Sequence, residues 1–250
     1  MASLSGKTVV ITGGVKNLGA IIAKDLAKLG SPNFVLHYHS ESSKADGDKL
    51  VEELKAAGSK AVLFQANLTK VAEITKLFDV AVQTFGGVDI AINTVGKVLK
   101  KPIEQLTEAE YDEMFDINSK VAFFFIKEAG AKLNKDGKIC TIVTSLLAAF
   151  TGYYSLYAGA KAPVEHYCRA AAKEFADKNI SVTNVAPGPM DTPFFYPQES
   201  DDAVAFHKSM ALKNQLTDVK DISPLVRFLV TEGWWVTGQT IFANGGYTTR

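Results

Sequence analysis

Short runs of β-branched and apolar residues alternate along the chain with longer segments in which apolar residues recur every three or four positions. The short runs predict strands. Seven segments fit this description: Lys7–Thr12, Asn33–Tyr38, Lys60–Gln65, Val88–Asn93, Lys138–Thr144, Ile180–Val185 and Gln239–Ala243. Strands this apolar, joined by helices, are buried on both faces, which indicates a parallel sheet covered on each side by right-handed crossovers. We therefore expect an α/β fold with a doubly wound parallel sheet, in a single domain over residues 1–250.

The longer segments have one apolar face, as helices packed on a sheet do. Leu18–Leu29, Asp46–Ala57 and Val71–Phe85 are each followed by glycine, which commonly ends a helix. Thr107 followed by Glu110 predicts a capping box at the start of a long helix. Asp221 is expected to cap a later helix. Phe123, Phe124 and Phe125 cover more than one face of the 108–133 helix, which suggests contact with another subunit as well as with its own sheet.

The stretch Pro187–Gln215 shows no clear periodicity. Three prolines surround Phe194, Phe195 and Tyr196, a composition that suits a mobile, partly apolar flap better than a core element. We expect residues of about 189–215 to cover a substrate and exclude water from it.

Composition and charge narrow the class of partner. The 250 residues are 47% hydrophobic and include 27 acidic and 27 basic residues, so no net charge gathers nucleic acid or an anionic membrane. Cys140 and Cys168 lack disulfide or zinc spacing, and no metal site is expected at His166 or His207 either. With no leader pattern and no apolar run of roughly 20 residues, we expect a soluble, cytoplasmic protein that acts on a small molecule.

The segment Thr12–Gly19 follows the first strand and opens the first helix, which is the setting of a dinucleotide-binding turn. Its glycines, Gly13 and Gly19, let the backbone approach a pyrophosphate, and the helix start offers unpaired N–H groups to the phosphates. Asn17 stands where glycine is usual, but asparagine tolerates a left-handed backbone.

The residue type about 20 positions beyond the last glycine distinguishes NAD from NADP, because an acidic residue there would bind the ribose 2′-hydroxyl of NAD. No carboxylate occurs there before Glu41, whereas Lys16, Ser40, Ser42 and Ser43 can serve a 2′-phosphate. We therefore expect NADP(H). In the alternative interpretation, His37 and His39 are strand-end residues on opposite faces and Glu41 reaches back to the ribose.

Ser145 ends the fifth predicted strand, and Tyr157 and Lys161 lie one helical turn apart on a shared face. A phenol has an ordinary pKa of about 10, and a nearby ammonium such as that of Lys161 would lower it by stabilising the phenolate. In the proposed chemistry Ser145 positions a carbonyl oxygen, Tyr157 donates a proton to it, and a nicotinamide supplies hydride to the carbon.

These motifs resemble the short-chain dehydrogenase/reductase family over essentially the whole chain. The matches are the turn with Gly13, Asn17 and Gly19, the Asn93–Gly96 segment after the fourth strand, Asn118, the Ser145, Tyr157 and Lys161 triplet, and Pro187–Gly188. The resemblance implies a Rossmann-like fold and a homotetramer or dimer. It also implies that Asn118 holds a water that links Lys161 to solvent. The sequence departs from the family pattern at Asn17, Thr94–Val95, Asn67, Asn244, and Leu146–Leu147 after Ser145.

Together, the residues and the resemblance assign roles around one site. The catalytic set is Ser145, Tyr157, Lys161 and Asn118. The expected coenzyme-binding set is Gly13, Lys16, Asn17, Leu18, Gly19, His39, Ser40, Asn67, Leu68, Asn93, Gly96, Tyr157, Lys161, Pro187, Gly188, Met190 and Thr192. Leu147, Tyr154, Phe194 and Phe195 are expected to meet the substrate. Trp234, Trp235, Phe242 and Tyr247 are interpreted as packing rather than as a substrate wall or subunit contact.

Three functions follow as hypotheses. The leading one is an NADP(H)-dependent carbonyl reductase acting on a 3-oxoacyl compound or on an aryl or alkyl ketone. The second is an NAD-dependent alcohol or polyol dehydrogenase. The third, suggested by Asn17 and by the altered Asn93–Gly96 segment, is a nucleotide-sensing protein that has kept the fold without turnover.

Overall fold

In the computed structural model, which describes residues 3–249, seven strands form one all-parallel sheet in the order β3-β2-β1-β4-β5-β6-β7. Their bounds are β1 Thr8–Thr12, β2 Asn33–Tyr38, β3 Ala61–Gln65, β4 Val88–Asn93, β5 Leu133–Ile142, β6 Ser181–Pro187 and β7 Gln239–Ala243. The expected doubly wound α/β fold is confirmed.

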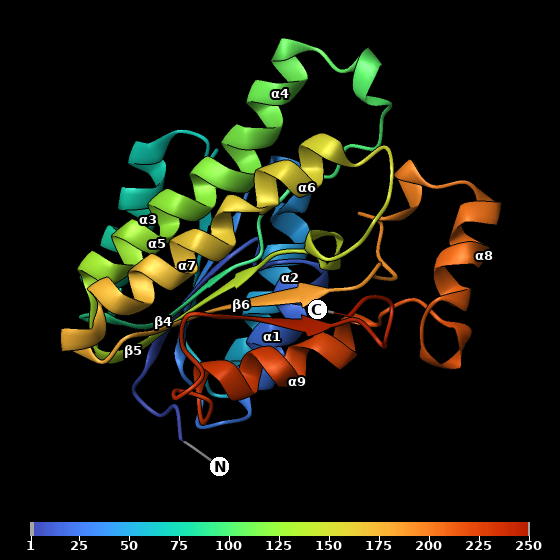
Figure 1. Cartoon of the computed structure of the whole chain (residues 1–250). Helices are drawn as coiled ribbons and strands as arrows, with labels where there is room; N and C mark the ends of the chain where they lie inside the picture. The colour runs from blue at the N-terminus through green and yellow to red at the C-terminus, as the bar shows by residue number, and fades with distance from the viewer. Residues whose placement is uncertain (1–2, 250) are drawn as a thin grey trace.

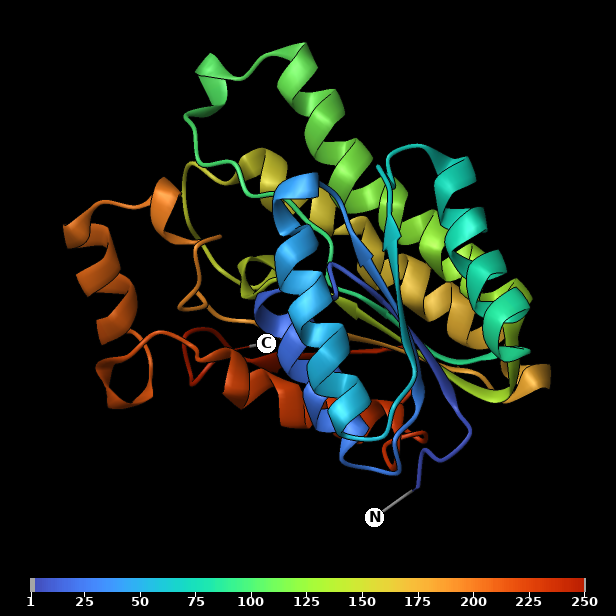
Figure 2. The same cartoon turned by 180° about the vertical axis from the view of Figure 1, so that it is seen from behind.

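Helices cover both faces of the sheet (Figures 1 and 2). Their bounds are α1 Asn17–Ala27, α2 Lys44–Ala56, α3 Val71–Phe85, α4 Glu108–Phe115, α5 Val121–Lys132, α6 Ser155–Lys161, α7 Pro163–Glu174, α8 Asp201–Ser209 and α9 Val219–Val230. Helices α3, α5 and α7 lie on one face, and α1, α2 and α9 lie on the other. Helix α8 stands away from the sheet, beside the ends of β6 and β7.

The core lies on both sides of the sheet because consecutive side chains of a strand point to opposite faces. In β1, Ile11 packs into the cluster with Leu26 of α1, whereas Val10 packs into the cluster with Phe78 of α3 and Phe125 of α5. All five side chains are fully buried. Full burial of one such side chain stabilises the folded state by about 1.5–3 kcal/mol. Burial on both faces explains the continuous apolar runs.

The order of the strands reverses between β1 and β4: β2 and β3 lie on one side of β1, and β4 and the later strands lie on the other. Strands β1 and β4 therefore pair directly although β2 and β3 intervene in sequence. In open α/β sheets a crevice forms beyond the carboxyl ends of the strands at such a crossover. The carboxyl ends here are Thr12 and Asn93, so the turn after β1 and the segment after β4 border the same crevice.

Several expected boundaries were wrong. Strand β5 runs over Leu133–Ile142 instead of Lys138–Thr144, because the Thr144 side chain accepts a bond from the Leu146 N–H and starts a 3-10 turn. Helix α9 is capped by Asp218, whose carboxylate accepts from the Lys220 N–H, and Asp221 lies inside the helix.

Two further expectations about helices need correction. The single long helix expected from Glu108 is interrupted by a π-helical turn at Asp116–Lys120, while the capping box of Thr107 and Glu110 is present as expected. The flap region contains helix α8, because Ser200 caps the Ala203 N–H and supplies a helix start that the prolines before it obscure in the sequence.

Within residues 3–249, no helix has the length and apolar character needed to cross a bilayer. Over the same residues, no group of three or more His, Cys, Asp or Glu side chains is arranged to hold a metal ion.

Candidate active site

The turn after β1 is tightly folded onto the start of α1. Gly13 and Asn17 both take left-handed backbone, with φ of +62° and +45°. A Cβ at Gly19 would lie 2.3 Å from the Gly13 carbonyl oxygen, so only glycine fits there. Asn17 therefore adopts the conformation expected of a glycine replacement. Among the described residues no side chain caps the first turn of α1, which leaves its N–H groups open to an anion.

His37 ties this turn to the neighbouring strands. Its Nδ1 accepts from the Gly13 N–H at 3.2 Å, and its Nε2 bonds the Ala66 carbonyl at 3.0 Å, which requires the tautomer protonated on Nε2. Burial lowers the pKa of His37 to about 4, against the opposing effect of the Ala66 bond. The imidazole is therefore neutral, and its position under the turn was missed by the sequence analysis.

His39 also bonds the Ala66 carbonyl, at 3.3 Å. The two histidines thus lie on the same side of β2, and the interpretation that placed them on opposite faces was wrong. The reason is geometric: residues two apart in a strand share a face.

A cleft of about 1520 Å³, including its open mouth, runs from this turn to the carboxyl ends of β4 and β5. Most of the expected coenzyme residues border it: Gly13, Lys16, Asn17, Leu18, Gly19, His39, Gly96, Tyr157, Lys161, Met190 and Thr192. Pro187 and Gly188 border the adjoining cavity. The elongated cleft and the open turn suit an extended dinucleotide.

Four expected residues border neither the cleft nor the adjoining cavity: Ser40, Asn67, Leu68 and Asn93. The Ser40 hydroxyl bonds that of Ser42, the Asn67 amide oxygen accepts from Thr69, and Leu68 is buried in the core. Asn93 is buried and accepts from the Thr12 hydroxyl at 2.6 Å. Their side chains serve local structure.

Thr192 is placed to bind a ligand at the inner end of the cleft. It is buried, and its hydroxyl oxygen has no hydrogen-bond partner within the described residues. An unpaired buried hydroxyl costs free energy unless a bound molecule satisfies it. Thr192 borders both the cleft and the adjoining cavity, so a group such as a carboxamide at their junction fits this site.

Helix α6 places Tyr157 and Lys161 one turn apart, and both side chains are buried. The Lys161 ammonium donates to the Ile142 carbonyl at 3.0 Å and to the Val95 carbonyl at 3.4 Å, at the ends of β5 and β4. Burial lowers the pKa of Lys161 to about 8.

The Tyr157 phenol does not have the lowered pKa expected from Lys161. Burial raises the pKa of Tyr157 to about 12, with a hydrogen bond to the Thr144 side chain acting in the opposite direction. The pKa is raised because the buried phenolate would lose its solvation, and because the Lys161 ammonium is directed at two carbonyls.

Asn118 lies in the π-helical turn between α4 and α5. Turns of this kind often occur at functional sites. Its amide donates to the Lys97 carbonyl at 2.9 Å and the Met114 carbonyl at 3.1 Å, and its oxygen accepts from the Lys97 N–H at 3.1 Å. Asn118 therefore anchors the segment after β4 beside Lys161.

The two hydroxyls that follow β5 face different partners. The Ser145 hydroxyl donates to the Ala186 carbonyl at 3.0 Å and accepts from the Asn244 amide at 3.0 Å. The Thr144 hydroxyl instead bonds the Tyr157 phenol. Ser145, which was expected beside Tyr157, is thus engaged with β6 and the residues after β7. Thr144 was expected only as the last residue of a strand.

A second cavity, of about 620 Å³ including its opening, adjoins the inner end of the cleft. Tyr154 and Phe194 flank Tyr157, each with its ring centre 6.5 Å from that of Tyr157. Phe195 also borders this cavity, but Leu147 does not: successive side chains of the 3-10 turn diverge, so Leu146 faces the cavity while Leu147 packs beside Val143.

Comparison with known proteins agrees with this geometry. Residues 13–248 match the family model described as enoyl-(acyl carrier protein) reductase. The short chain dehydrogenase/reductase nsrJ of Aspergillus novofumigatus is 35% identical over 258 residues, covering 97% of this chain and 96% of nsrJ. The chain belongs to the short-chain dehydrogenase/reductase family.

Two further proteins are similar to the chain over almost its whole length. The hydroxynaphthalene reductase-like protein Arp2 of Metarhizium anisopliae is 35% identical over 268 residues, covering 99% of this chain and 97% of Arp2. A crystal structure of a putative dehydrogenase from Burkholderia cenocepacia with bound NADP is 58% identical, covers 100% of this chain and 96% of that chain, and has a TM-score of 0.98.

Proposed function

We propose that the chain is an NADP(H)-dependent carbonyl reductase that interconverts a ketone and a secondary alcohol. One observation carries the proposal: the coenzyme-sized cleft and the smaller cavity share Tyr157, Met190, Thr192 and Phe194. A proton donor therefore stands where a nicotinamide ring in the cleft would meet a substrate in the cavity.

The coenzyme is NADP(H). Where β2 ends, the cleft is bordered by His37, Tyr38, His39 and Ser43, with no carboxylate to bind a free ribose 2′-hydroxyl. Lys16 pairs with Asp46 at 2.9 Å, but both side chains are about half exposed, and such a pair is weak enough to yield to a phosphate. The bound NADP of the Burkholderia cenocepacia protein supports this choice.

When bound, NADPH supplies the hydride. The Tyr157 phenol donates its proton to the carbonyl oxygen, and a pKa of about 12 keeps that phenol protonated at neutral pH. We assign the positioning of the carbonyl oxygen to the Thr144 hydroxyl, which already bonds the phenol. The Val95 and Ile142 carbonyls hold the buried Lys161 ammonium one helical turn from Tyr157, and Asn118 holds the segment that packs beside Lys161.

The cavity favours a compact aryl or alkyl ketone over a polyol. Its walls include Val98, Leu146, Phe194 and Phe195, which offer apolar and aromatic surface and few partners for sugar hydroxyls. The name of Arp2, a hydroxynaphthalene reductase-like protein, agrees with an aromatic substrate. A cytoplasmic location and a homo-oligomer, either a tetramer or a dimer, complete the proposal.

The test is turnover of a ketone panel with NADPH and with NADH, for wild type and Tyr157→Phe. The panel includes 2-tetralone, acetophenone and an acetoacetyl thioester, and polyols are offered with NADP and NAD. We expect NADPH-dependent reduction, and a loss of about 10²–10⁴-fold in Tyr157→Phe because proton donation is removed. Faster reduction of the ketones with NADH, or faster oxidation of polyols with NAD, would support the dehydrogenase, and no turnover with any compound would support the sensor.

Thr144→Val and Ser145→Ala form a matched pair for the positioning hydroxyl. We expect Thr144→Val to lower kcat by about 10²-fold and Thr144→Ser to restore it, because only the hydroxyl is needed. Ser145→Ala should lower kcat far less. Circular dichroism and NADPH affinity check that each variant folds, and a larger kcat loss in Ser145→Ala would return the role to Ser145.

A further inference from the structure

Glu199 is a charged residue buried beside the substrate cavity without any part in the chemistry described above. It follows the flap residues Phe194 and Phe195, and its side chain is 0% exposed. A buried carboxylate is costly unless it is paired and hydrogen-bonded. The hydrogen-bond and ion-pair partners of Glu199 therefore indicate the role of this buried carboxylate.

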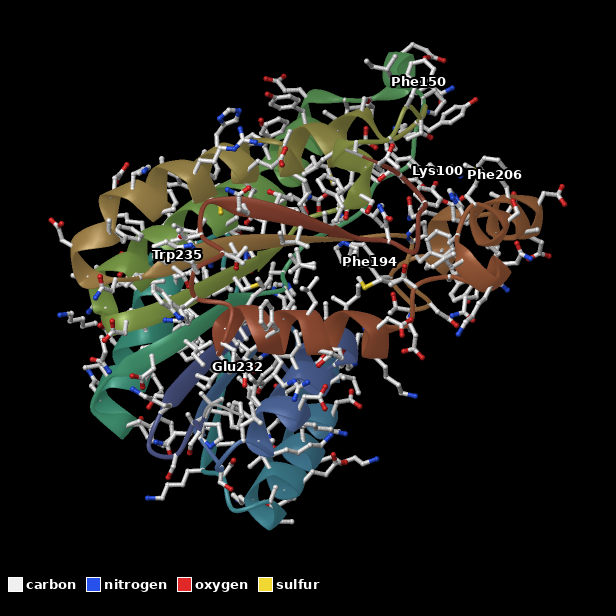
Figure 3. All side chains as sticks on the ribbon, turned by 60° about the horizontal axis from the view of Figure 1, so that its bottom comes forward. Lys100, Phe150, Phe194, Phe206, Glu232 and Trp235 are labelled. Carbon is white, nitrogen blue, oxygen red and sulfur yellow. The ribbon has the colours of Figure 1, made fainter. Side chains whose placement is uncertain are left out.

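Those partners come from separate parts of the chain. One carboxylate oxygen accepts from the Tyr154 hydroxyl, and the other accepts from the Lys100 ammonium and faces His207 Nε2 at 3.5 Å. The partners Lys100 and Tyr154 lie 99 and 45 residues away in sequence. We call Lys100, Tyr154, Glu199 and His207 the Glu199 cluster; Figure 3 shows Lys100 reaching toward α8.

Two further bonds strengthen the attachment of the flap. The Lys100 N–H donates to the Gln198 side-chain oxygen at 3.0 Å, so neighbouring flap residues hold the same lysine. On α8, His207 Nδ1 bonds the Tyr247 hydroxyl at 2.8 Å. Burial lowers the pKa of His207, although the Glu199 carboxylate opposes this, and the neutral ring can bond both neighbours.

The cluster stands directly behind the cavity wall. Tyr154, Gln198 and Tyr247 all border the cavity. Tyr154 and Phe194 of the flap are both cavity residues, and the ring centre of each lies 6.5 Å from that of Tyr157. A carboxylate that holds Tyr154 from the flap therefore sets how far apart the two walls stand.

Resting on the proposed reductase function, we propose that Glu199 is a positioning residue for substrate specificity: through Tyr154 and Lys100 it holds the flap against the body of the protein and fixes the width of the ketone cavity. Glu199 itself borders neither the ketone cavity nor the coenzyme cleft. Its loss should relax the fit of a compact ketone more than it slows proton transfer.

The kinetic test compares Glu199→Gln and Tyr154→Phe with wild type on 2-tetralone and on a bulkier ring-substituted tetralone. We expect KM for 2-tetralone to rise about tenfold or more in both variants, with kcat within about threefold, and the preference for the compact ketone to fall. NADPH affinity should stay within about twofold, since the cleft is untouched. The loss in the double variant should be smaller than the two single losses combined, because both substitutions act on the contact between Tyr154 and Glu199.

Glu73→Gln is the matched control. Glu73 lies on α3 in an ion pair with Lys76 and borders neither cavity, so it removes the same charge without touching the flap. Its KM values and ketone preference should equal those of wild type. Equal KM values in wild type and folded Glu199→Gln would overturn the proposal, as would an unchanged ketone preference in Tyr154→Phe if Glu199→Gln fails to fold.

Hydrogen exchange of residues 194–209 without any ketone separates this proposal from the proposed function. We expect about tenfold or faster exchange there in Glu199→Gln and Tyr154→Phe, and wild-type exchange in Glu73→Gln. Faster flap exchange in a protein that reduces no ketone would keep the flap attachment and remove the reductase. Unchanged flap exchange in both variants would overturn the attachment whatever the activity.

Discussion

At the residue scale, the active site depends on side chains that hold other groups in place. His37 holds the Gly13 N–H, Asn17 takes the left-handed conformation that the turn needs, and Thr144 bonds the Tyr157 phenol. Asn17 belongs to the recognisable turn after β1, whereas His37 and Thr144 belong to no motif. Each contributes to the active site only because residues elsewhere in the chain supply its hydrogen-bond partner or impose its backbone conformation.

His37 should make the protein acid-sensitive. Its folded pKa of about 4 lies below the ordinary value of 6.5, so between those values the unfolded chain binds a proton that the folded chain does not. Stability therefore rises with pH across this window, and as pH falls from 6.5 to 4 His37 removes about 3 kcal/mol of unfolding free energy.

Urea unfolding at several pH values measures this effect as the difference between wild type and His37→Gln. The variant should lose the His37 contribution to the pH dependence. His166→Gln is the control, because His166 is exposed on α7. If wild type and His37→Gln lost stability in parallel between pH 6.5 and 4, the buried imidazole would not be the cause.

At the element scale, helix ends and interruptions decide where functional groups stand. The π-helical turn at Asp116–Lys120 presents Asn118 to the backbone of Lys97, and the 3-10 turn after β5 separates Thr144 from Ser145. These local departures from regular structure shift side-chain directions in ways that a helical or strand period does not anticipate.

The start of α9 gives a stability prediction at this scale. Asp218→Ala should lower the free energy of unfolding by about 1 kcal/mol, because the Asp218 carboxylate caps the Lys220 N–H. Asp221→Ala keeps the cap and should cost less than about half as much, through the helix dipole alone. Chemical denaturation of both variants compares them, and a larger cost at Asp221 would contradict the assigned cap.

At the scale of the whole molecule, the crossover between β1 and β4 produces the cleft, and the outer surface retains large aromatic groups. Trp235 is 81% exposed and Trp234 is 54% exposed, which corrects their interpretation as packing residues. Phe123 on α5 is also exposed, whereas Phe125 is buried. The Trp234 and Trp235 rings are in contact, with centres 5.1 Å apart, and aromatic side chains are enriched at contact surfaces between proteins.

We therefore predict that the protein is a homo-oligomer in solution and that Trp235→Ser shifts it toward smaller species. Loss of the indole removes apolar area from the contact without disturbing the core of the chain. Light scattering after size-exclusion chromatography measures the mass. Tyr153→Ser, which changes another exposed aromatic residue, is the control, and a wild-type mass equal to one chain would contradict the prediction.

Local pattern was sufficient for much of the fold. The alternation of apolar runs with helical segments predicted all seven strands of the described sheet, because burial on both faces leaves a direct mark on composition. The turn at Gly13–Gly19 and the pairing of Tyr157 with Lys161 were also readable, since both depend on spacing within one or two turns of chain. Boundaries set by caps, such as those at Thr144 and Asp218, were not.

The sequence by itself thus determined the strand and helix order, the phosphate turn and the shared face of Tyr157 and Lys161, all of which depend on neighbours in the chain. Only the tertiary structure decided which hydroxyl contacts the Tyr157 phenol and whether the pKa of that phenol is raised or lowered. It also decided that Glu199 pairs with Lys100, 99 residues away in sequence. These properties arise from desolvation and from contacts between distant segments, and neither leaves a periodic signal in the sequence.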